Sequence, residues 1–230
     1  MTQDDAKRAV AARAVEFVED GMRVGLGTGS TSTMFIRALG EKVRGGLKIR
    51  CVASSDASQA LGIELGMDVT TLGELPELDV YIDGADEVCV LPGGGLGLIK
   101  GGGGALLREK IVASAAKRFV VVVDSSKVVE RLGKFPLPVE VVKMALPLVE
   151  PKLAALNLRP KLRMNKDGSE PYLTDECNYI LDCSCGEIVD PAATAAAVRG
   201  IVGVVEHGLF LGMAELALVA GDDGVRELRA

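Results

Sequence analysis

The segment MRVGLGTGSTS, residues 22–32, is the part of this 230-residue chain that decides the fold. Its first five residues read as a short strand, the glycine and hydroxyl residues that follow form a loop, and a helical pattern then runs through Leu39. Strand, glycine loop and helix in this order are typical of a parallel sheet that binds a ligand beyond the carboxyl ends of its strands. The glycines allow a tight turn, and the N–H groups at the start of a helix attract an anion.

This segment matches no nucleotide-binding motif. Counting G-x-G-x-x-G from Gly25 reaches Ser30, counting from Gly27 reaches Ser32, and no P-loop lysine follows. An ordinary strand-to-helix turn capped by Ser or Thr is the plainer interpretation. The combination of glycines, hydroxyls and a helix start nevertheless favours a loop that binds the phosphate of a small ligand.

The alternation of strand and helix continues on both sides of this segment. Continuous apolar strands separated by helices indicate a parallel sheet that is covered on both faces. The further elements that we expect are a helix at 4–19, strands at 47–52, 79–82 and 119–123, and helices at 56–65 and 105–116.

The pattern changes after Gly133, where KFPLP at 134–138 marks a break before a smaller α+β domain. Strands expected at 202–206 and 216–219 either complete this domain or return to the first sheet, and the sequence leaves both open. The other expected elements are strands at 139–142, 161–164 and 178–183 and helices at 146–156 and 191–199.

Two further loops, at 83–87 and 100–104, follow expected strands and therefore lie at the same sheet edge as loop 27–32. DGADE at 83–87 crowds three carboxylates into five residues, which suits sugar hydroxyls or acid/base chemistry. A magnesium site and a solvated, helix-capping turn are the alternatives. We favour the sugar hydroxyls, because no nucleotide phosphate is indicated that a metal would bridge.

The sequence KGGGGALLREK at 100–110 places four glycines before a helix. Such a run is useful where a ligand approaches the main chain closely or where N–H groups stabilise an oxyanion. Glu109 lies early in the helix, where a carboxylate can also be a solvated residue that complements the helix dipole. Lys127 and Lys7 bring cations to the same edge, although most lysines are simply solvated.

The composition excludes several classes of partner. A net charge of -6, a pI near 5.0 and 3% aromatic residues argue against nucleic acid. No apolar run reaches about 18 residues and no signal peptide is recognisable, so we expect no membrane and a cytoplasmic protein. The five cysteines read as reduced thiols, and Cys183, Cys185 and His207 lack the spacing of metal ligands, so we expect no metal.

Taken together, the motifs resemble those of the type A ribose-5-phosphate isomerases. They follow the family order over nearly the whole chain: GTGST at 27–31, DGADE at 83–87, KGGGGALLREK at 100–110, DSSK at 124–127, then YLTDE, NYILD and EHGLF at 206–210. The resemblance implies interconversion of D-ribose 5-phosphate and D-ribulose 5-phosphate through an enediolate. It implies no metal or organic cofactor and a place in the non-oxidative pentose phosphate pathway.

The resemblance also implies a doubly wound, mostly parallel (Rossmann-like) α/β catalytic domain over 1–130 and 207–230. A smaller ferredoxin-like α+β domain would occupy 131–206, and family members are homodimers or homotetramers. The only expected ligand is a phosphorylated pentose.

Carried onto this sequence, the resemblance makes Glu109 the base that moves a proton between carbon 2 and carbon 1. Asp83 and Asp86 would hold sugar hydroxyls, with Asp83 the helper in ring opening, and Lys100 would stabilise the enediolate. The residues implied to bind substrate are Thr28, Gly29, Ser30, Thr31, Gly84, Ala85, the backbone of Gly101, Gly102 and Gly103, and Lys127 and Lys7 near the phosphate.

The chain departs from the family pattern at a few places. CVLPGGGLG at 89–97 is longer and richer in glycine than the usual link, and we expect it to bulge as a loop. Cys177 and Cys185 stand where a glycine and an aromatic residue are expected. We expect His207 to be a structural residue near the domain junction and not an acid or base.

Two other functions compete with the isomerase. A non-catalytic sugar-phosphate sensor would share the fold, but no basic helix-turn-helix segment is attached and the catalytic set is complete. A coenzyme A transferase also uses a glutamate near glycine-rich loops, but this chain is short for one and carries sugar-phosphate motifs.

Overall fold

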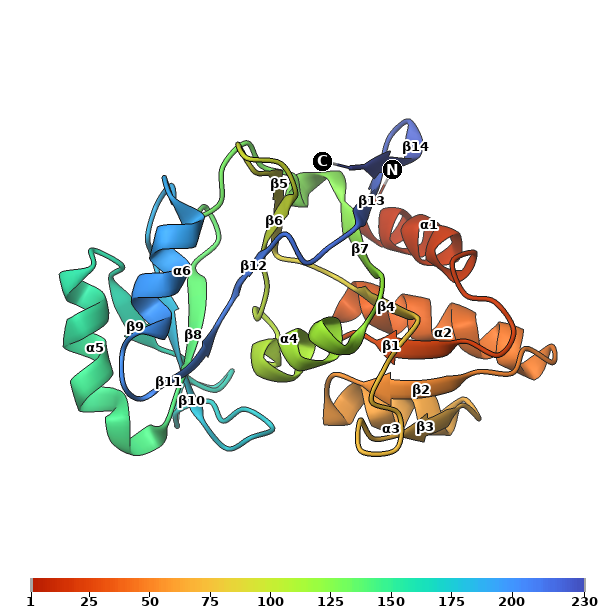
Figure 1. The fold of residues 1–230 in the computed structure, drawn as a ribbon, viewed down its shortest axis with the longest axis horizontal. Coiled ribbons are helices and arrows are strands. Elements are labelled where there is room, and N and C mark those ends of the chain that lie inside the picture. Colours follow the sequence, from red (N-terminus) through yellow and green to blue (C-terminus); the bar gives the residue numbers. More distant parts are fainter. Residues whose placement is uncertain (1, 230) are drawn as a thin grey trace.

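The computed structural model describes residues 2–229, and its largest sheet has seven strands in the order β14-β13-β7-β4-β1-β2-β3 (Figure 1). Neighbouring strands are parallel except at the edge, where β14 runs antiparallel to β13. The strands are β1 (Arg23–Leu26), β2 (Arg50–Ala53), β3 (Asp68–Thr70), β4 (Val80–Asp83), β7 (Phe119–Asp124), β13 (Leu216–Gly221) and β14 (Gly224–Leu228).

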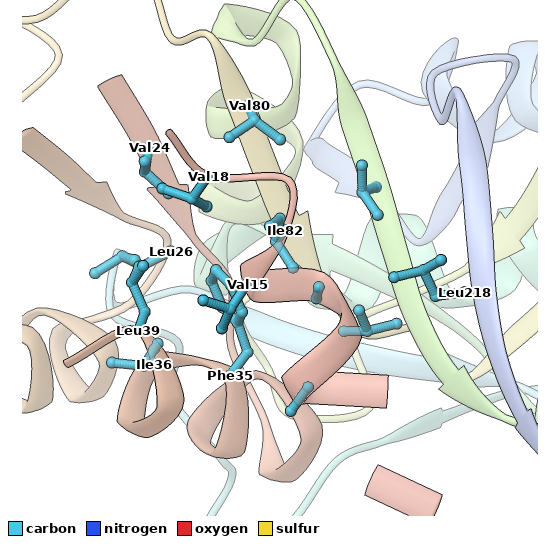
Figure 2. Packing of buried hydrophobic residues seen from close by; sticks show 14 of the residues in the cluster. Val15, Val18, Val24, Leu26, Phe35, Ile36, Leu39, Val80, Ile82 and Leu218 are labelled. Carbon is cyan, nitrogen blue, oxygen red and sulfur yellow. The ribbon is translucent and has the colours of Figure 1, made fainter. Parts of the chain in front are cut away.

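Helices cover both faces of this sheet. The first three pack on one face, where Phe35 and Ile36 lie against Leu26 and Ile82 in a buried apolar cluster (Figure 2). The fourth helix packs on the opposite face, where Val112 is buried with Tyr81. The helices are α1 (Gln3–Val15), α2 (Ser30–Arg44), α3 (Asp56–Glu64) and α4 (Leu106–Ala115).

The strand order reverses at β1, which pairs with both β2 and β4. From β1 the chain winds through β2 and β3 in one direction and through β4, β7 and β13 in the other. The loops after β1 and β4 therefore flank the point where a doubly wound sheet opens a crevice at its carboxyl edge.

A second sheet is antiparallel, with the order β11-β8-β10-β9 and two helices in a βαββαβ sequence, which is the ferredoxin-like arrangement. The predicted fold class is confirmed. The sequence left open which sheet the last two expected strands join. In the structure β11 belongs to this sheet and β13 belongs to the large one. The domain limits at 130 and 206 stay a prediction. The elements are β8 (Leu137–Val141), α5 (Leu146–Ala155), β9 (Pro160–Leu162), β10 (Tyr179–Cys183), α6 (Pro191–Arg199) and β11 (Val204–His207), with short 3₁₀ helices η1 (Ser125–Lys127) and η2 (Lys143–Ala145).

The expectation that residues 89–97 bulge as a loop is wrong. β5 (Glu87–Val90) and β6 (Leu96–Ile99) form an antiparallel hairpin, and β12 (Leu209–Leu211) adds a third strand. The turn needs glycine because Gly94 and Gly95 have φ of +88° and +84°.

This three-stranded sheet runs between the two larger sheets and contributes to both cores (Figure 1). Leu96 and Leu98 are buried with residues of the large sheet, whereas Ile99 and Cys89 are buried with the ferredoxin-like domain. Alternate residues of a strand point to opposite faces, so one hairpin serves both sides. Lys100 follows β6 directly, and its position is therefore set by both cores.

Cys177 adopts φ of +59°, a left-handed conformation that favours glycine. This explains why a glycine is the expected residue there. All five cysteines are free thiols, and no helix within residues 2–229 is both long and apolar enough to cross a bilayer.

We expect Leu98→Ala to lower the free energy of unfolding by about 2–5 kcal/mol, because it removes a fully buried side chain from the shared layer. The control is Val90→Ala on the same hairpin, where the side chain is 45% exposed and the expected loss is below about 1 kcal/mol. Urea unfolding of both variants is the measurement. A loss for Leu98→Ala as small as that expected for the control would show that the hairpin is not part of the core.

Candidate active site

A cavity of about 150 Å³ opens at the carboxyl edge of the large sheet. The loops after β1, β4, β6 and β7 line it together with α1 and α4. Every residue that the sequence implicates lines this cavity except Asp83 and Gly102, and Gln3, Val123 and Asp124 line it in addition. The full lining is Gln3, Lys7, Thr28, Gly29, Ser30, Thr31, Gly84, Ala85, Asp86, Lys100, Gly101, Gly103, Glu109, Val123, Asp124 and Lys127.

The loop after β1 offers an anion site. Gly29 precedes α2 with φ of +97° and supplies no side-chain cap, so the first N–H groups of the helix have no side-chain acceptor at this position. Lys7 from α1 and Lys127 from η1 line the same cavity. Helix N–H groups and two ammonium groups together suit a phosphate.

Asp83 lies behind the cavity wall and is completely buried. Its Oδ1 accepts hydrogen bonds from the Thr28 amide at 2.8 Å, the Ser32 hydroxyl at 2.8 Å and its neighbour Gly84's amide at 2.7 Å. Its Oδ2 accepts from the Tyr81 hydroxyl and, at 2.7 Å, from Lys100 Nζ. The carboxylate thus ties the loops after β1 and β4 together, and it bonds three residues that line the cavity, Thr28, Gly84 and Lys100.

Lys100 carries a buried ammonium group, and the residue is 2% exposed. Besides Asp83, Nζ donates to the Gly84 carbonyl at 2.6 Å and lies 3.4 Å from Glu109 Oε2. Burial by itself lowers the pKa of this amine, but the adjacent Asp83 and Glu109 carboxylates outweigh burial and raise it. Lys100 is therefore a fixed positive charge at neutral pH.

Glu109 is a buried carboxyl group in the cavity lining, and its pKa is strongly raised. Burial raises the pKa of its carboxyl to about 8, although the Lys100 ammonium acts in the opposite direction. Its Oε2 is buried and has no hydrogen-bond partner among the described residues. A carboxyl group whose pKa lies near neutral pH can both take up and return a proton.

The two remaining acidic residues of DGADE separate in the fold. Asp86 lines the cavity, and its Oδ2 accepts from the Gly102 amide at 2.7 Å. Glu87 is buried away from it and accepts from the amides of Gly133 at 2.7 Å and Phe135 at 2.6 Å. Asp86 is available to a ligand, whereas Glu87 joins the hairpin to the segment before β8.

The residues considered for metal lie elsewhere. His207 is buried in β11 outside the cavity lining, and burial lowers the pKa of its imidazole to about 4, so it is neutral at pH 7. Within residues 2–229 no group of three His, Cys, Asp or Glu side chains is placed to hold a metal ion.

Sequence reasoning missed Asp124 and Gln3. Asp124 ends β7, and it accepts from the Ser126 amide at 3.0 Å and from Gln3 Nε2 at 3.4 Å. A signal was present, since Asp124 opens the DSSK motif at the carboxyl end of an apolar strand. No such signal marks Gln3, because its position in the cavity depends on how α1 packs against the sheet.

Comparison with known proteins shows the family of the chain. The family model of ribose 5-phosphate isomerase A (phosphoriboisomerase A) matches residues 50–224. The ribose-5-phosphate isomerase A of Brucella suis is 50% identical over 233 residues, covering 98% of each chain.

Two solved structures superpose over the full length of both chains. The ribose 5-phosphate isomerase A of Methanocaldococcus jannaschii has a TM-score of 0.94 and 39% identity. A D-ribose-5-phosphate isomerase in complex with phospho-erythronic acid has a TM-score of 0.95 and 38% identity. The chain belongs to the ribose 5-phosphate isomerase A family, whose members are intramolecular oxidoreductases.

Proposed function

We propose that this protein interconverts D-ribose 5-phosphate and D-ribulose 5-phosphate, with Glu109 as the proton-shuttling base. The observation that carries the proposal is the buried pair of Glu109 and Lys100, whose groups lie 3.4 Å apart in a cavity that also presents two lysines and a helix start. One part of this cavity suits a phosphate and the other suits proton transfer at carbon.

The chemistry follows from these groups. A proton next to a carbonyl leaves only if the developing enediolate charge is stabilised, and the fixed ammonium of Lys100 supplies that stabilisation. Glu109 takes the proton from carbon 2 and returns it to carbon 1, so one carboxyl acts as base and then as acid. In the same conversion the proton of the carbon-2 hydroxyl moves to the oxygen on carbon 1. Asp86 would hold a sugar hydroxyl, and Asp83 would assist ring opening through Lys100.

The solved relative with phospho-erythronic acid supports this reading. That ligand is a phosphorylated sugar acid, and its carboxylate is planar and negatively charged, as is the enediolate, which carries its oxygens on two adjacent carbons. The family resemblance further suggests a cytoplasmic homodimer or homotetramer in the non-oxidative pentose phosphate pathway, acting without metal or organic cofactor. Sedimentation analysis tests the assembly.

We expect Glu109→Gln to lower kcat by about 10²–10⁴-fold in a coupled assay with EDTA, because the shuttling base is lost while the shape is kept. The matched control is Glu140→Gln, which changes another buried carboxylate with an unpartnered oxygen, outside the cavity. Its kcat should stay within about twofold. Full activity of Glu109→Gln would overturn the assignment of the base.

We expect kcat/KM of the wild-type protein to rise with pH through about 8. The pKa of Glu109 is raised to about 8 by burial, so the carboxylate needed as base is depleted below that value and complete above it. A pH profile measured well below saturation checks this. A profile that is flat from pH 6 to 9 would contradict it.

We expect Lys127→Gln and Lys7→Gln each to raise KM by about 10-fold or more with a smaller effect on kcat, because each removes a charged partner of the phosphate. Inhibition by inorganic phosphate should weaken in parallel. The control is Lys117→Gln, an exposed lysine paired with Asp79 outside the cavity, for which no change in KM is expected. An unchanged KM in both test variants would exclude them from the phosphate site.

A further inference from the structure

We propose that Arg163, which directly follows β9 in the ferredoxin-like domain, is a positioning residue that aims the N–H of Gly103 into the active-site cavity. The inference rests on the proposed function, in which the glycine loop 101–104 stabilises the enediolate. Arg163 itself does not line the cavity, so it would act only through the loop.

All three nitrogen atoms of the Arg163 guanidinium group donate hydrogen bonds. Nε and Nη2 bind the two carboxylate oxygens of Asp182 in β10 at 2.8 and 2.5 Å. Nη1 donates to the carbonyls of Gly101 at 2.9 Å and Gly102 at 3.2 Å. The side chain is only 13% exposed, and the Asp182 pair fixes the plane of the fork.

These bonds determine where the loop amides point. A trans peptide is planar, and its C=O and N–H point in opposite directions. Because the Gly101 carbonyl faces Arg163, the Gly102 N–H points the other way, and there it donates to Asp86 at 2.7 Å. The Gly102 carbonyl also faces Arg163, so by the same rule the Gly103 N–H points away from Arg163.

Gly103 lines the cavity, and its N–H has no protein acceptor in the hydrogen bonds of the described chain. A backbone donor that is free, fixed and beside Lys100 is what a developing oxyanion requires. The Gly102 N–H, in contrast, is occupied by Asp86. The structure thus points to Gly103, and not Gly102, as the donor in this loop.

The loop needs such an external partner. Four glycines have no side chains with which to hold their own conformation, and each has a large backbone entropy to lose. Gly101 and Gly104 have φ of +105° and +87°. Tyr172 of the ferredoxin-like domain packs against Gly104, where a Cβ would collide with its ring. Arg163 and Tyr172, neither of which lines the cavity, together restrain the loop from outside it.

The test is Arg163→Lys, assayed with ribose 5-phosphate and with phospho-erythronic acid as inhibitor. A lysine keeps the charge but cannot bind Asp182 with two groups and both carbonyls at once. We expect kcat to fall by about 10–100-fold while KM changes by less than about threefold. The inhibition constant of phospho-erythronic acid should rise in parallel with the loss of kcat. The loss of kcat should be larger for Arg163→Ala than for Arg163→Lys.

The control is Arg108→Lys. Arg108 also joins the two domains, through Glu176 at 2.6 Å and Asp175 at 3.4 Å, but among the described residues its side chain donates no hydrogen bond to loop 101–104. Its kcat should stay within about threefold, and thermal melts confirm that each variant is folded. If Arg163→Lys does not fold, Asp182→Asn, which weakens the anchor of the guanidinium, should show the same split between kcat and KM.

The outcomes separate the two proposals. An inactive wild-type protein would overturn the proposed function and this inference with it. An active wild type with unchanged kcat in the folded Arg163 variants would overturn only the inference. Equal losses in the Arg163 and Arg108 variants would also overturn it, since they would show a general effect of domain contact.

Discussion

The buried ion pair of Lys100 and Asp83 is the interaction on which the rest of the site depends. Taking two charges out of water is costly, and such a pair is tolerated only where further hydrogen bonds satisfy both groups. Here Asp83 accepts from the amides of Thr28 and Gly84 and from two hydroxyls, while Lys100 also donates to a carbonyl. The pair therefore requires β1, β4 and β6 to end at one place, and it explains why their loops cannot be repositioned separately.

The same pair sets the state of Glu109. Asp83 and Glu109 are both acidic and share one ammonium between them, and Asp83 holds the shorter contact, 2.7 Å against 3.4 Å. Burial then leaves Glu109 with a pKa raised to about 8. The fold thus places two carboxyl groups on one ammonium group, and the pKa of one of them, Glu109, is raised far enough for it to gain and lose a proton near neutral pH.

The sequence was sufficient for the order of the large elements and for most of the cavity lining, because apolar periodicity and glycine loops are local signals. Prediction from the sequence failed where the position of a residue depends on packing against residues far away in the chain. The DGADE motif does not reveal that Asp83 is buried, Asp86 lines the cavity and Glu87 ties down another segment, since each carboxylate meets a partner far along the chain. Residues 89–97 likewise belong to a hairpin whose second strand, β6, also pairs with β12, more than a hundred residues later.

The same contacts indicate a structural role for the ferredoxin-like domain. Within the described chain it supplies no residue to the cavity lining, and every lining residue comes before position 128. It nevertheless shares a core layer with β5 and β6, and Lys100 directly follows β6. Arg163 of this domain also bonds the carbonyls of the glycine loop that comes next. One domain thus presents the chemical groups, and the other fixes the backbone segment least able to hold its own shape. A glycine-rich loop allows close approach to a ligand, and contacts with the adjoining domain hold that loop in one conformation.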